Sequence, residues 1–383
     1  MKKRYRLSSI AIMAFAVAFF SGCSDEFLQE KKNYGNFGEE IYDSYIGAQA
    51  RVNTLYNYLL PSSTGSIGWN SVSAGTADIN AKSTEEYGGF SDYVNPNVVL
   101  DNTNVPDYIF QEFGSNNSKS PYGHIRECNM VIKGITDSSL EKSEKEELLG
   151  QAYFFRAWRY YLLVKMYGGV PIVDHVQNPV IGDGNGENLV IPRSSTKDCV
   201  NFICNDLDLA SRYLPVRWEG NDYGRITSGA ALALKGRMLL LYASPLFNRA
   251  DDQSRWKAAY DANSEAIAAL KAGSFGLAYE SNGGENNAKN WAKMFADYTG
   301  GSEAVFVTLY NNVSPIAGQN INKYNLWEQG IRPGNINGGG GRTATAEMVD
   351  LFPMADGKRP GESIYTYDNE GSKFFMNRDP RFY

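Results

Sequence analysis

The chain has 383 residues, 43% of them hydrophobic, which is enough for two average domains or for one large helical domain with a sizeable core. Its net charge of −6 argues against a nucleic-acid partner, because phosphate binding needs a concentrated cationic face. Only two histidines are present, which disfavours a histidine-rich metal site and most histidine-dependent catalysis. Tyrosine (25) and tryptophan (6) supply an excess of aromatic surface.

The N-terminus predicts a lipoprotein signal peptide over residues 1–22. A cationic stretch, Met1–Arg6, precedes an apolar stretch, Leu7–Phe20, that is too short to span a bilayer. Small residues then lead directly into Cys23, as in a lipobox, where the peptide is cut and the cysteine is acylated. We therefore expect an acylated N-terminus at Cys23 and a polar tether over residues 23–38. An ordinary secretory signal with an incidental cysteine is the alternative.

Three cysteines follow Cys23, at positions 128, 199 and 204, and an odd number cannot all pair within one chain. Cys199 and Cys204 lie five residues apart on a predicted helix, so their side chains point in different directions and are poor disulfide partners. We expect Cys128, Cys199 and Cys204 to be buried thiols.

Apolar spacing and the positions of proline and glycine predict the secondary structure. Helices are expected over residues 39–60, 121–135, 141–167, 195–214, 227–244, 255–272 and 345–352, and a short strand over residues 304–310. Paired helices with short connections indicate a mainly α protein of stacked, tetratricopeptide-like hairpins, although no clean 34-residue repeat is present. Residues 61–120 and 273–342 are rich in turn residues and predict long irregular loops that carry the ligand surface.

Two helices carry detailed expectations. The spacing from Ser138 to Glu141 is that of a capping box at the start of helix 141–167, and Gly168 and Gly169 are typical stop residues at its end. Helix 255–272 is expected to bury one apolar face, made of Trp256, Ala259, Tyr260, Ile267 and Leu270.

Several stretches, in the same order along the chain, resemble landmarks of the SusD/RagB family of nutrient-binding lipoproteins. They are Gly150–Tyr161 with Met166–Pro171, Gly224–Ala231 with Leu241–Asn248, and Thr345–Phe352 with Asp356–Lys358 and Arg378–Phe382. The small residues allow helices to approach closely, and the aromatic residues fill wider gaps. Arg156 and Arg159 share one helical stripe, and we expect them to bond neighbouring helix ends or acids rather than a ligand.

The resemblance implies a non-catalytic, surface-exposed glycan-binding lipoprotein of the cell outer membrane. It implies a single SusD-like helical domain over residues 39–383 that hands oligosaccharide to a SusC-like, TonB-dependent transporter. Family members continue past the Arg378–Phe382 landmark, whereas this sequence stops at Tyr383, so we expect a domain truncated at its C-terminus. A lipid-anchored glycosidase and a repeat-helix scaffold that binds only protein are the alternative hypotheses.

The sequence assigns no catalytic residue, metal or cofactor. The glycine run Gly338–Gly341 lacks the lysine and hydroxyl of a phosphate-binding loop. Asp183–Glu187 alternates oxygen ligands, but Asn188 and Ser194 stand where a calcium-binding loop needs glycine and glutamate, so a polar turn is expected. Nothing singles out two of the 43 acids as a glycosidase pair, and a Gly-x-Ser-x-Gly elbow is absent.

The predicted ligand-binding residues lie in the two irregular stretches. Sugars offer flat C–H faces and many hydroxyls, so a binder needs exposed aromatic rings with polar side chains at their edges. Loop residues that fit are Trp69, Asn70, Asp78, Asn80, Tyr87 and Tyr93 in the first stretch, and Tyr324, Trp327 and Arg332 in the second. Each aromatic residue could instead pack its loop onto the scaffold.

Overall fold

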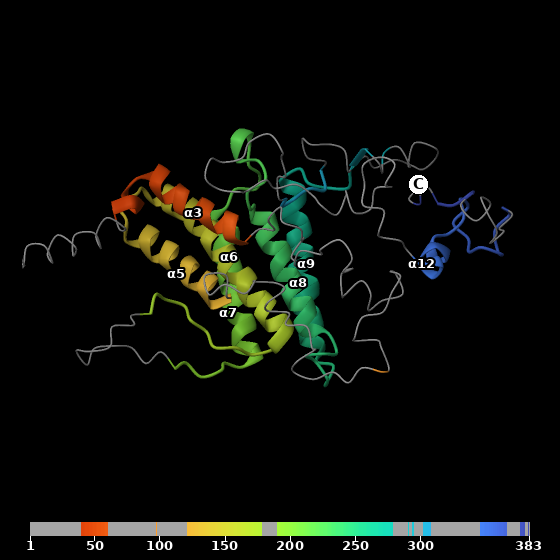
Figure 1. Ribbon diagram of the computed structural model, residues 1–383, viewed down its shortest axis with the longest axis horizontal. Coiled ribbons are helices and arrows are strands. Elements are labelled where there is room, and N and C mark those ends of the chain that lie inside the picture. Colours follow the sequence, from red (N-terminus) through yellow and green to blue (C-terminus); the bar gives the residue numbers. More distant parts are fainter. Residues whose placement is uncertain are drawn as a thin grey trace, which may run out of the picture.

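The fold is a row of packed helices, seen in a computed structural model (Figure 1). The structure describes residues 40–59, 121–177, 190–278, 302–307, 345–365 and 376–379, with the single positions 97, 290, 293, 294 and 382. In chain order the elements are η2 (Glu40–Asp43), α3 (Tyr45–Leu59), α5 (Pro121–Asp137), α6 (Lys142–Tyr167), α7 (Thr196–Tyr213), η5 (Gly220–Asp222), α8 (Ser228–Ala243), α9 (Gln253–Ala272) and α12 (Ala346–Leu351).

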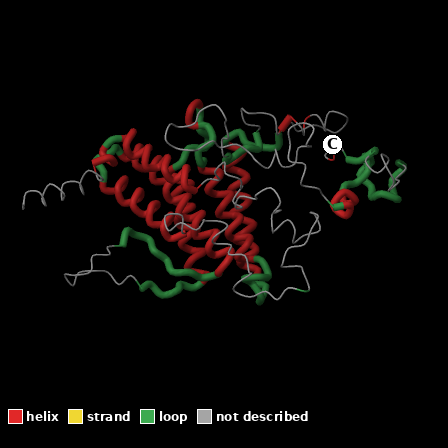
Figure 2. The backbone as a smooth tube through the Cα atoms, viewed as in Figure 1, coloured by secondary structure: helices red, strands yellow, loops and turns green. Residues whose placement is uncertain are grey.

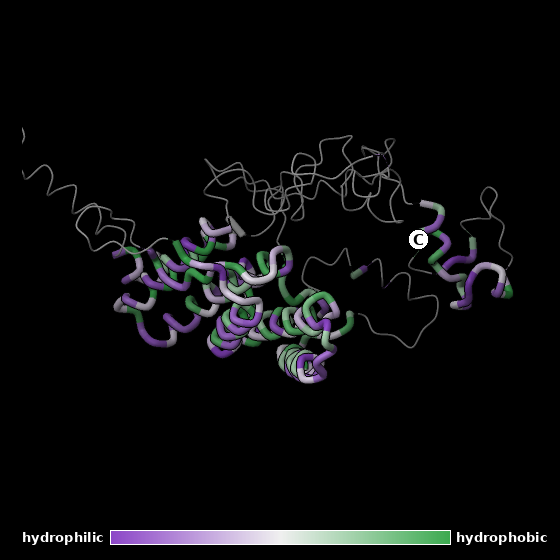
Figure 3. The backbone as a smooth tube through the Cα atoms, turned by 90° about the horizontal axis from the view of Figure 1, so that it is seen from below, coloured by the Kyte–Doolittle hydropathy of each residue, from purple (hydrophilic) through white to green (hydrophobic). Residues whose placement is uncertain are grey.

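Neighbouring helices pack in sequence order, as expected of stacked hairpins. Helix α3 packs on α5 and α6, α6 packs on α7, α7 on α8 and α8 on α9 (Figures 1 and 2). Helices α5 and α6 form the predicted hairpin, joined by only four residues. Hydrophobic positions recur around the turns of these helices (Figure 3), and one continuous core runs from α3 to α8. The mainly α, paired-helix prediction is confirmed.

Local capping chemistry sets the helix ends. Ser195, Thr227, Asp252 and Thr345 each accept a hydrogen bond from a backbone N–H of the helix that they precede. The predicted capping box was displaced by one turn: the Glu144 carboxylate accepts from the backbone N–H of Glu141, at 3.2 Å. Ser138 instead donates to the carbonyl of Ile135 at the end of α5, at 2.8 Å, because α6 begins at Lys142, three residues later than a cap at Ser138 requires.

The predicted buried face of α9 is confirmed at Ala259, and Trp256 and Leu270 are half-buried, but the prediction is wrong for Tyr260 and Ile267. Tyr260 and Ile267 are 74% and 55% exposed, and the buried positions are Ala259, Ala262 and Ala266. The cause lies in α8, where Gly229 and Gly236 leave room for a close approach: a Cβ on Gly236 would lie 2.5 Å from Asn263 Oδ1. Beside these glycines α9 places Leu270 and Asn263, and its buried alanines lie on the same face of the helix, so Tyr260 and Ile267 are turned outward.

The predicted strand over residues 304–310 is not found in its described part, residues 302–307, which form turns. Its apolar residues pack on helices instead: the Phe306 ring lies 5.5 Å from that of Phe154 and 5.9 Å from that of Trp158. The apolar pattern therefore reflected burial against α6. Residues 308–310 lie outside the described residues.

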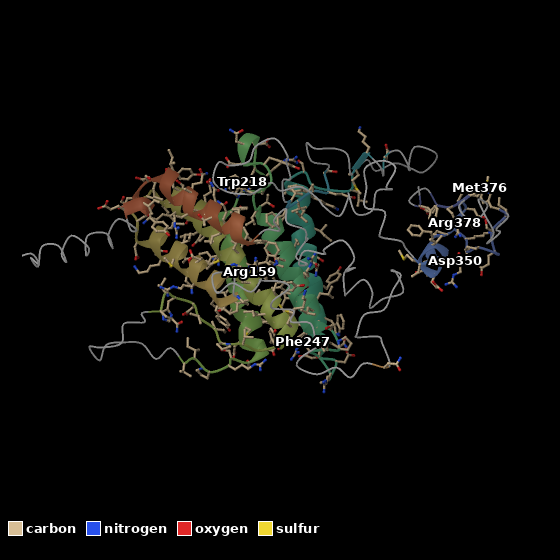
Figure 4. The ribbon with its side chains drawn as sticks, in the orientation of Figure 1. Arg159, Trp218, Phe247, Asp350, Met376 and Arg378 are labelled. Atoms are coloured by element: carbon tan, nitrogen blue, oxygen red, sulfur yellow. The ribbon has the colours of Figure 1, made fainter. Side chains whose placement is uncertain are left out.

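A small unit around α12 lies apart from the row of helices in Figure 1. It is built around Arg378, whose buried guanidinium donates to the carbonyl of Phe352 at 3.0 Å and lies 3.3 Å from Asp350 (Figure 4). The same guanidinium lies over the Phe382 ring. The Arg378–Phe382 motif therefore has a structural role, because its arginine holds the end of α12 and the Phe382 ring together.

Within the described part of the chain, none of the helices is both long enough and apolar enough to cross a membrane. The predicted signal peptide, residues 1–22, and the tether, residues 23–38, lie outside the described residues, as does the lipid-attachment residue Cys23. Their assignment stays a prediction.

Candidate functional site

The predicted ligand-binding residues also lie outside the described residues. This holds for Trp69, Asn70, Asp78, Asn80, Tyr87, Tyr93, Tyr324, Trp327 and Arg332. The structure does describe where the two segments that carry them join the scaffold. The first leaves α3 after Leu59 and returns at Pro121, and the second runs between Ala278 and Thr345.

The last described turns of α3 give the first segment a firm base. The Tyr56 ring packs edge-on against Phe155, with ring centroids 4.7 Å apart. Its hydroxyl donates to Gln151 Oε1 at 2.8 Å and accepts from the backbone N–H of Ile226 at 3.1 Å. Burial raises the pKa of this phenol well above its usual range, so it stays neutral. A single side chain thus ties α3 to α6 and to the start of α8.

Arg156 is the centre of a buried polar cluster rather than a ligand site. Its guanidinium donates to both carboxylate oxygens of Asp206, at 2.7 and 2.8 Å. It also donates to Asn129 Oδ1 and to the backbone carbonyl of Asp174, each at 2.8 Å. Burial raises the pKa of the Asp206 carboxyl, and the paired guanidinium opposes that rise. The expected structural role of Arg156 is confirmed, since its donors are directed at α5, α7 and the segment after α6.

Arg159, three residues further along α6, is buried beside the Trp158 ring, with its guanidinium carbon 5.8 Å from the ring centroid. The label in Figure 4 places it within the row of helices. Both arginines of the stripe therefore belong to the scaffold.

The three described cysteines offer no nucleophile at neutral pH. Cys128 and Cys199 are buried, as expected, but Cys204 is only half-buried, because its face of α7 is incompletely covered. Burial raises the pKa of the Cys128 thiol to about 12 and that of Cys204 to about 11, and it raises the pKa of Cys199 as well. All three are free thiols in the structure. The described residues also contain no group of three side chains suited to holding a metal ion.

A hollow of ligand size opens where α8 turns into α9, beside the start of α7. It has a volume of about 420 Å³ and is lined by Thr196, Tyr242, Leu246, Phe247, Arg249 and Arg255. Figure 4 shows Phe247 at this end of α8 and α9, opposite to Trp218. The recess beside Trp218 measures about 10 Å³, no more than a single water needs.

Asn248 shapes the turn that forms the hollow. Its buried side chain donates to the carbonyls of Ala243 and Asp252, at 3.2 and 3.1 Å, and accepts from the backbone N–H of Asp252 at 2.9 Å. The turn is therefore tied to both helices, and the neighbouring Leu246, Phe247 and Arg249 line the hollow. The sequence does not predict this site. Four of its lining residues lie in or next to the stretch Leu241–Asn248, which resembles a family landmark but carries no separate signal of a ligand site.

Comparison with known proteins supplies the family. Residues 27–240 match the family described as "Starch-binding associating with outer membrane", of SusD-like type, and residues 302–383 match the SusD family. This chain belongs to the SusD family. The stretches that suggested the resemblance fall within these two matches, apart from the residues at 241–248.

Individual relatives agree. A SusD-like protein of Bacteroides ovatus is 25% identical over 242 residues, which cover 61% of this chain and 39% of that protein. The crystal structure of a SusD-like protein from Bacteroides fragilis superposes with a TM-score of 0.59 at 22% identity, covering 89% of this chain and 60% of that one. A SusD-like carbohydrate binding protein from the same species also gives 0.59, at 18% identity, covering 89% and 59%. These structures share the tetratricopeptide-like helical fold, and this chain spans less than two thirds of their length.

Proposed function

We propose that this protein is a non-catalytic glycan-binding lipoprotein of the cell outer membrane. It would hold oligosaccharide at the cell surface and pass it to a SusC-like, TonB-dependent transporter. The observation that carries the proposal is membership of a family described as starch-binding and associated with the outer membrane. The predicted lipobox at Cys23 supports the anchor.

The helical row suits a binding role. Its buried ions Arg156 and Asp206 are bonded to each other, and its described thiols are protonated at neutral pH. Such a scaffold can hold loops in fixed places without taking part in chemistry itself. The predicted sugar-stacking residues Trp69 and Trp327 lie in segments that begin at its helix ends.

The test for binding uses the purified full chain in detergent and a panel of oligosaccharides that begins with starch fragments. Calorimetric titration should detect binding of at least one glycan, and a reducing-sugar assay should detect no cleavage of it. Release of reducing ends, abolished by a single carboxylate substitution, would instead establish the glycosidase. Failure of every glycan, with capture of a protein partner, would favour the protein-binding scaffold.

The anchor has its own test. Cys23→Ala removes the sulfur that would carry the lipid, so the variant should lose lipid labelling and leave the membrane fraction. Unchanged labelling and membrane retention would contradict the lipobox. Purification of the wild-type chain from outer membranes with an associated transporter would test the proposed partner.

A further inference from the structure

The hollow beside Phe247 is lined by two arginines: Arg255 contacts its neighbours in the helical row, and Arg249 has no hydrogen-bond or ion-pair partner among the described residues. Arg255 donates to the backbone carbonyl of Phe247 at 2.9 Å, and its guanidinium stacks over the Tyr242 ring, 4.0 Å from the centroid. Arg249 is exposed and makes no hydrogen bond or ion pair with any described residue. Because the Asn248 anchor holds the turn, the position of Arg249 at the hollow is maintained without a partner for its charge.

The charge of the hollow is positive, on a chain whose net charge is −6. No acid lines it. Three acids close in sequence to the lining residues are occupied. Asp252 accepts from the backbone N–H of Ser254 and lies 3.8 Å from Arg255 Nε, Asp251 accepts from Trp256 Nε1 at 2.9 Å, and Asp198 accepts from the hydroxyl of Ser195 at 2.6 Å. Asp252 offsets part of the charge of Arg255, so Arg249 is the main cationic group available to a ligand.

The remaining lining is aromatic and hydroxylic. Phe247 and Tyr242 provide rings, and the neighbouring Leu246 is 64% exposed. The hydroxyls of Thr196 and Tyr242 make no hydrogen bond with the described residues. A volume of about 420 Å³ falls within the range of ligand sites, roughly 300–1,000 Å³. Rings, free hydroxyls and a guanidinium together suit a ligand that has an apolar face, hydroxyl groups and a negative charge.

We propose that this hollow binds the carboxylate-bearing sugar of an acidic glycan, a uronic acid. Its carboxylate pairs with the Arg249 guanidinium, and its C–H face packs on Phe247. The inference rests on the proposed glycan-binding function and adds a charged-sugar site on the scaffold, away from the predicted loop residues. A neutral sugar would leave the charge of Arg249 unused, and a free phosphate would leave the aromatic walls uncovered.

The test compares trigalacturonate with its fully methyl-esterified form, which keeps the sugar rings and removes the charges. Calorimetric titration of the full chain should show at least tenfold tighter binding of the acid at low salt, and this preference should shrink as salt is added. Arg249→Gln should weaken binding of the acid about tenfold and leave binding of the ester unchanged, because one charge-assisted contact is lost. Phe247→Leu should weaken binding of both forms.

Arg126→Gln is the matched control, since Arg126 is an exposed arginine of α5 that does not line the hollow; the variant should bind both forms as the wild type does. Thermal melts of every variant establish that it is folded. If the wild type binds trigalacturonate and Arg249→Gln binds it equally well, the hollow is not the site, although the glycan-binding function stands. If the acid shows no advantage over the ester while other glycans bind, the inference is again wrong. If no glycan of any kind binds, both proposals fail.

Discussion

Arg156 and Asp206 show how strongly one buried pair can hold three helices together. The two side chains are 6% and 4% exposed, and they share two hydrogen bonds across 50 residues of sequence. Removing either partner leaves an uncompensated charge in the core. Asp206→Ala should therefore lower the free energy of unfolding by about 3–5 kcal/mol, as measured by urea denaturation.

Two further variants test whether the buried charge causes this loss of stability. The double variant Arg156→Met with Asp206→Leu removes both charges, so it should be markedly more stable than Asp206→Ala. Asp208→Ala breaks a more exposed pair, Lys235 Nζ to Asp208 Oδ1 at 2.6 Å, and should change stability by about 1 kcal/mol or less. Equal losses from the two single substitutions would show that burial of Asp206 is not the cause.

At the scale of elements, the end of α6 requires two glycines for different reasons, one for its backbone conformation and one for the space around it. Gly168 ends the helix with φ of +70°, in the region that favours glycine. Gly169 has an ordinary φ but no room: a Cβ there would lie 2.1 Å from the backbone carbonyl oxygen of Ser194. Arg193 holds the same contact by donating to the carbonyls of Tyr167 and Gly169. The segment before α7 can pass beside α6 only because position 169 lacks a side chain.

Gly169→Ala should lower the free energy of unfolding by about 1–3 kcal/mol, because backbone must move to make room for the methyl group. Gly276→Ala is the matched control: a Cβ there meets nothing within 4 Å, and its φ is not positive, so the protein should keep or slightly gain stability. Denaturant midpoints of both variants measure the difference. A Gly169→Ala protein as stable as Gly276→Ala would mean that the approach of the two backbones is looser than the structure shows.

The helices could be predicted from the sequence because their signals are local. Caps such as Ser195 and Thr227 lie at the predicted ends, and six of the seven predicted helices agree with the structure to within two residues at each end. The first, predicted over residues 39–60, is divided into the 3-10 helix η2 and helix α3, which begins only at Tyr45. The exposure of Tyr260 and Ile267 on α9 could not be predicted, because the buried face of α9 depends on Gly229 and Gly236 of another helix. The partner of Arg156 was equally non-local, since Asp206 is only one of 43 acids until α6 and α7 are brought together. The hollow at Phe247 likewise requires three helix ends to meet.

On the scale of the whole molecule, we expect the row of helices to determine stability and the two long connecting segments to carry the proposed sugar binding. Trp158 belongs to the row: its ring lies 6.0 Å from that of Phe154 and 5.9 Å from that of Phe306, against the core. Trp69 stands among glycine, asparagine and serine, and Trp327 lies near Asn325 and Gly330; neither is on a periodic apolar face, so packing places less demand on them. The three tryptophans should therefore respond to truncation in opposite ways.

Trp69→Ala and Trp327→Ala should each weaken glycan binding about tenfold or more, through loss of a stacking surface, and leave the melting temperature nearly unchanged. Trp158→Ala should do the reverse, because the cavity left against Phe154 and Phe306 lowers the free energy of unfolding by about 3 kcal/mol while the connecting segments keep their rings. Calorimetric titration with a bound glycan and thermal melts on the three variants measure both effects. If the Trp69 and Trp327 variants bind normally but melt early, those residues pack the connecting segments onto the scaffold, and sugar recognition depends on other side chains.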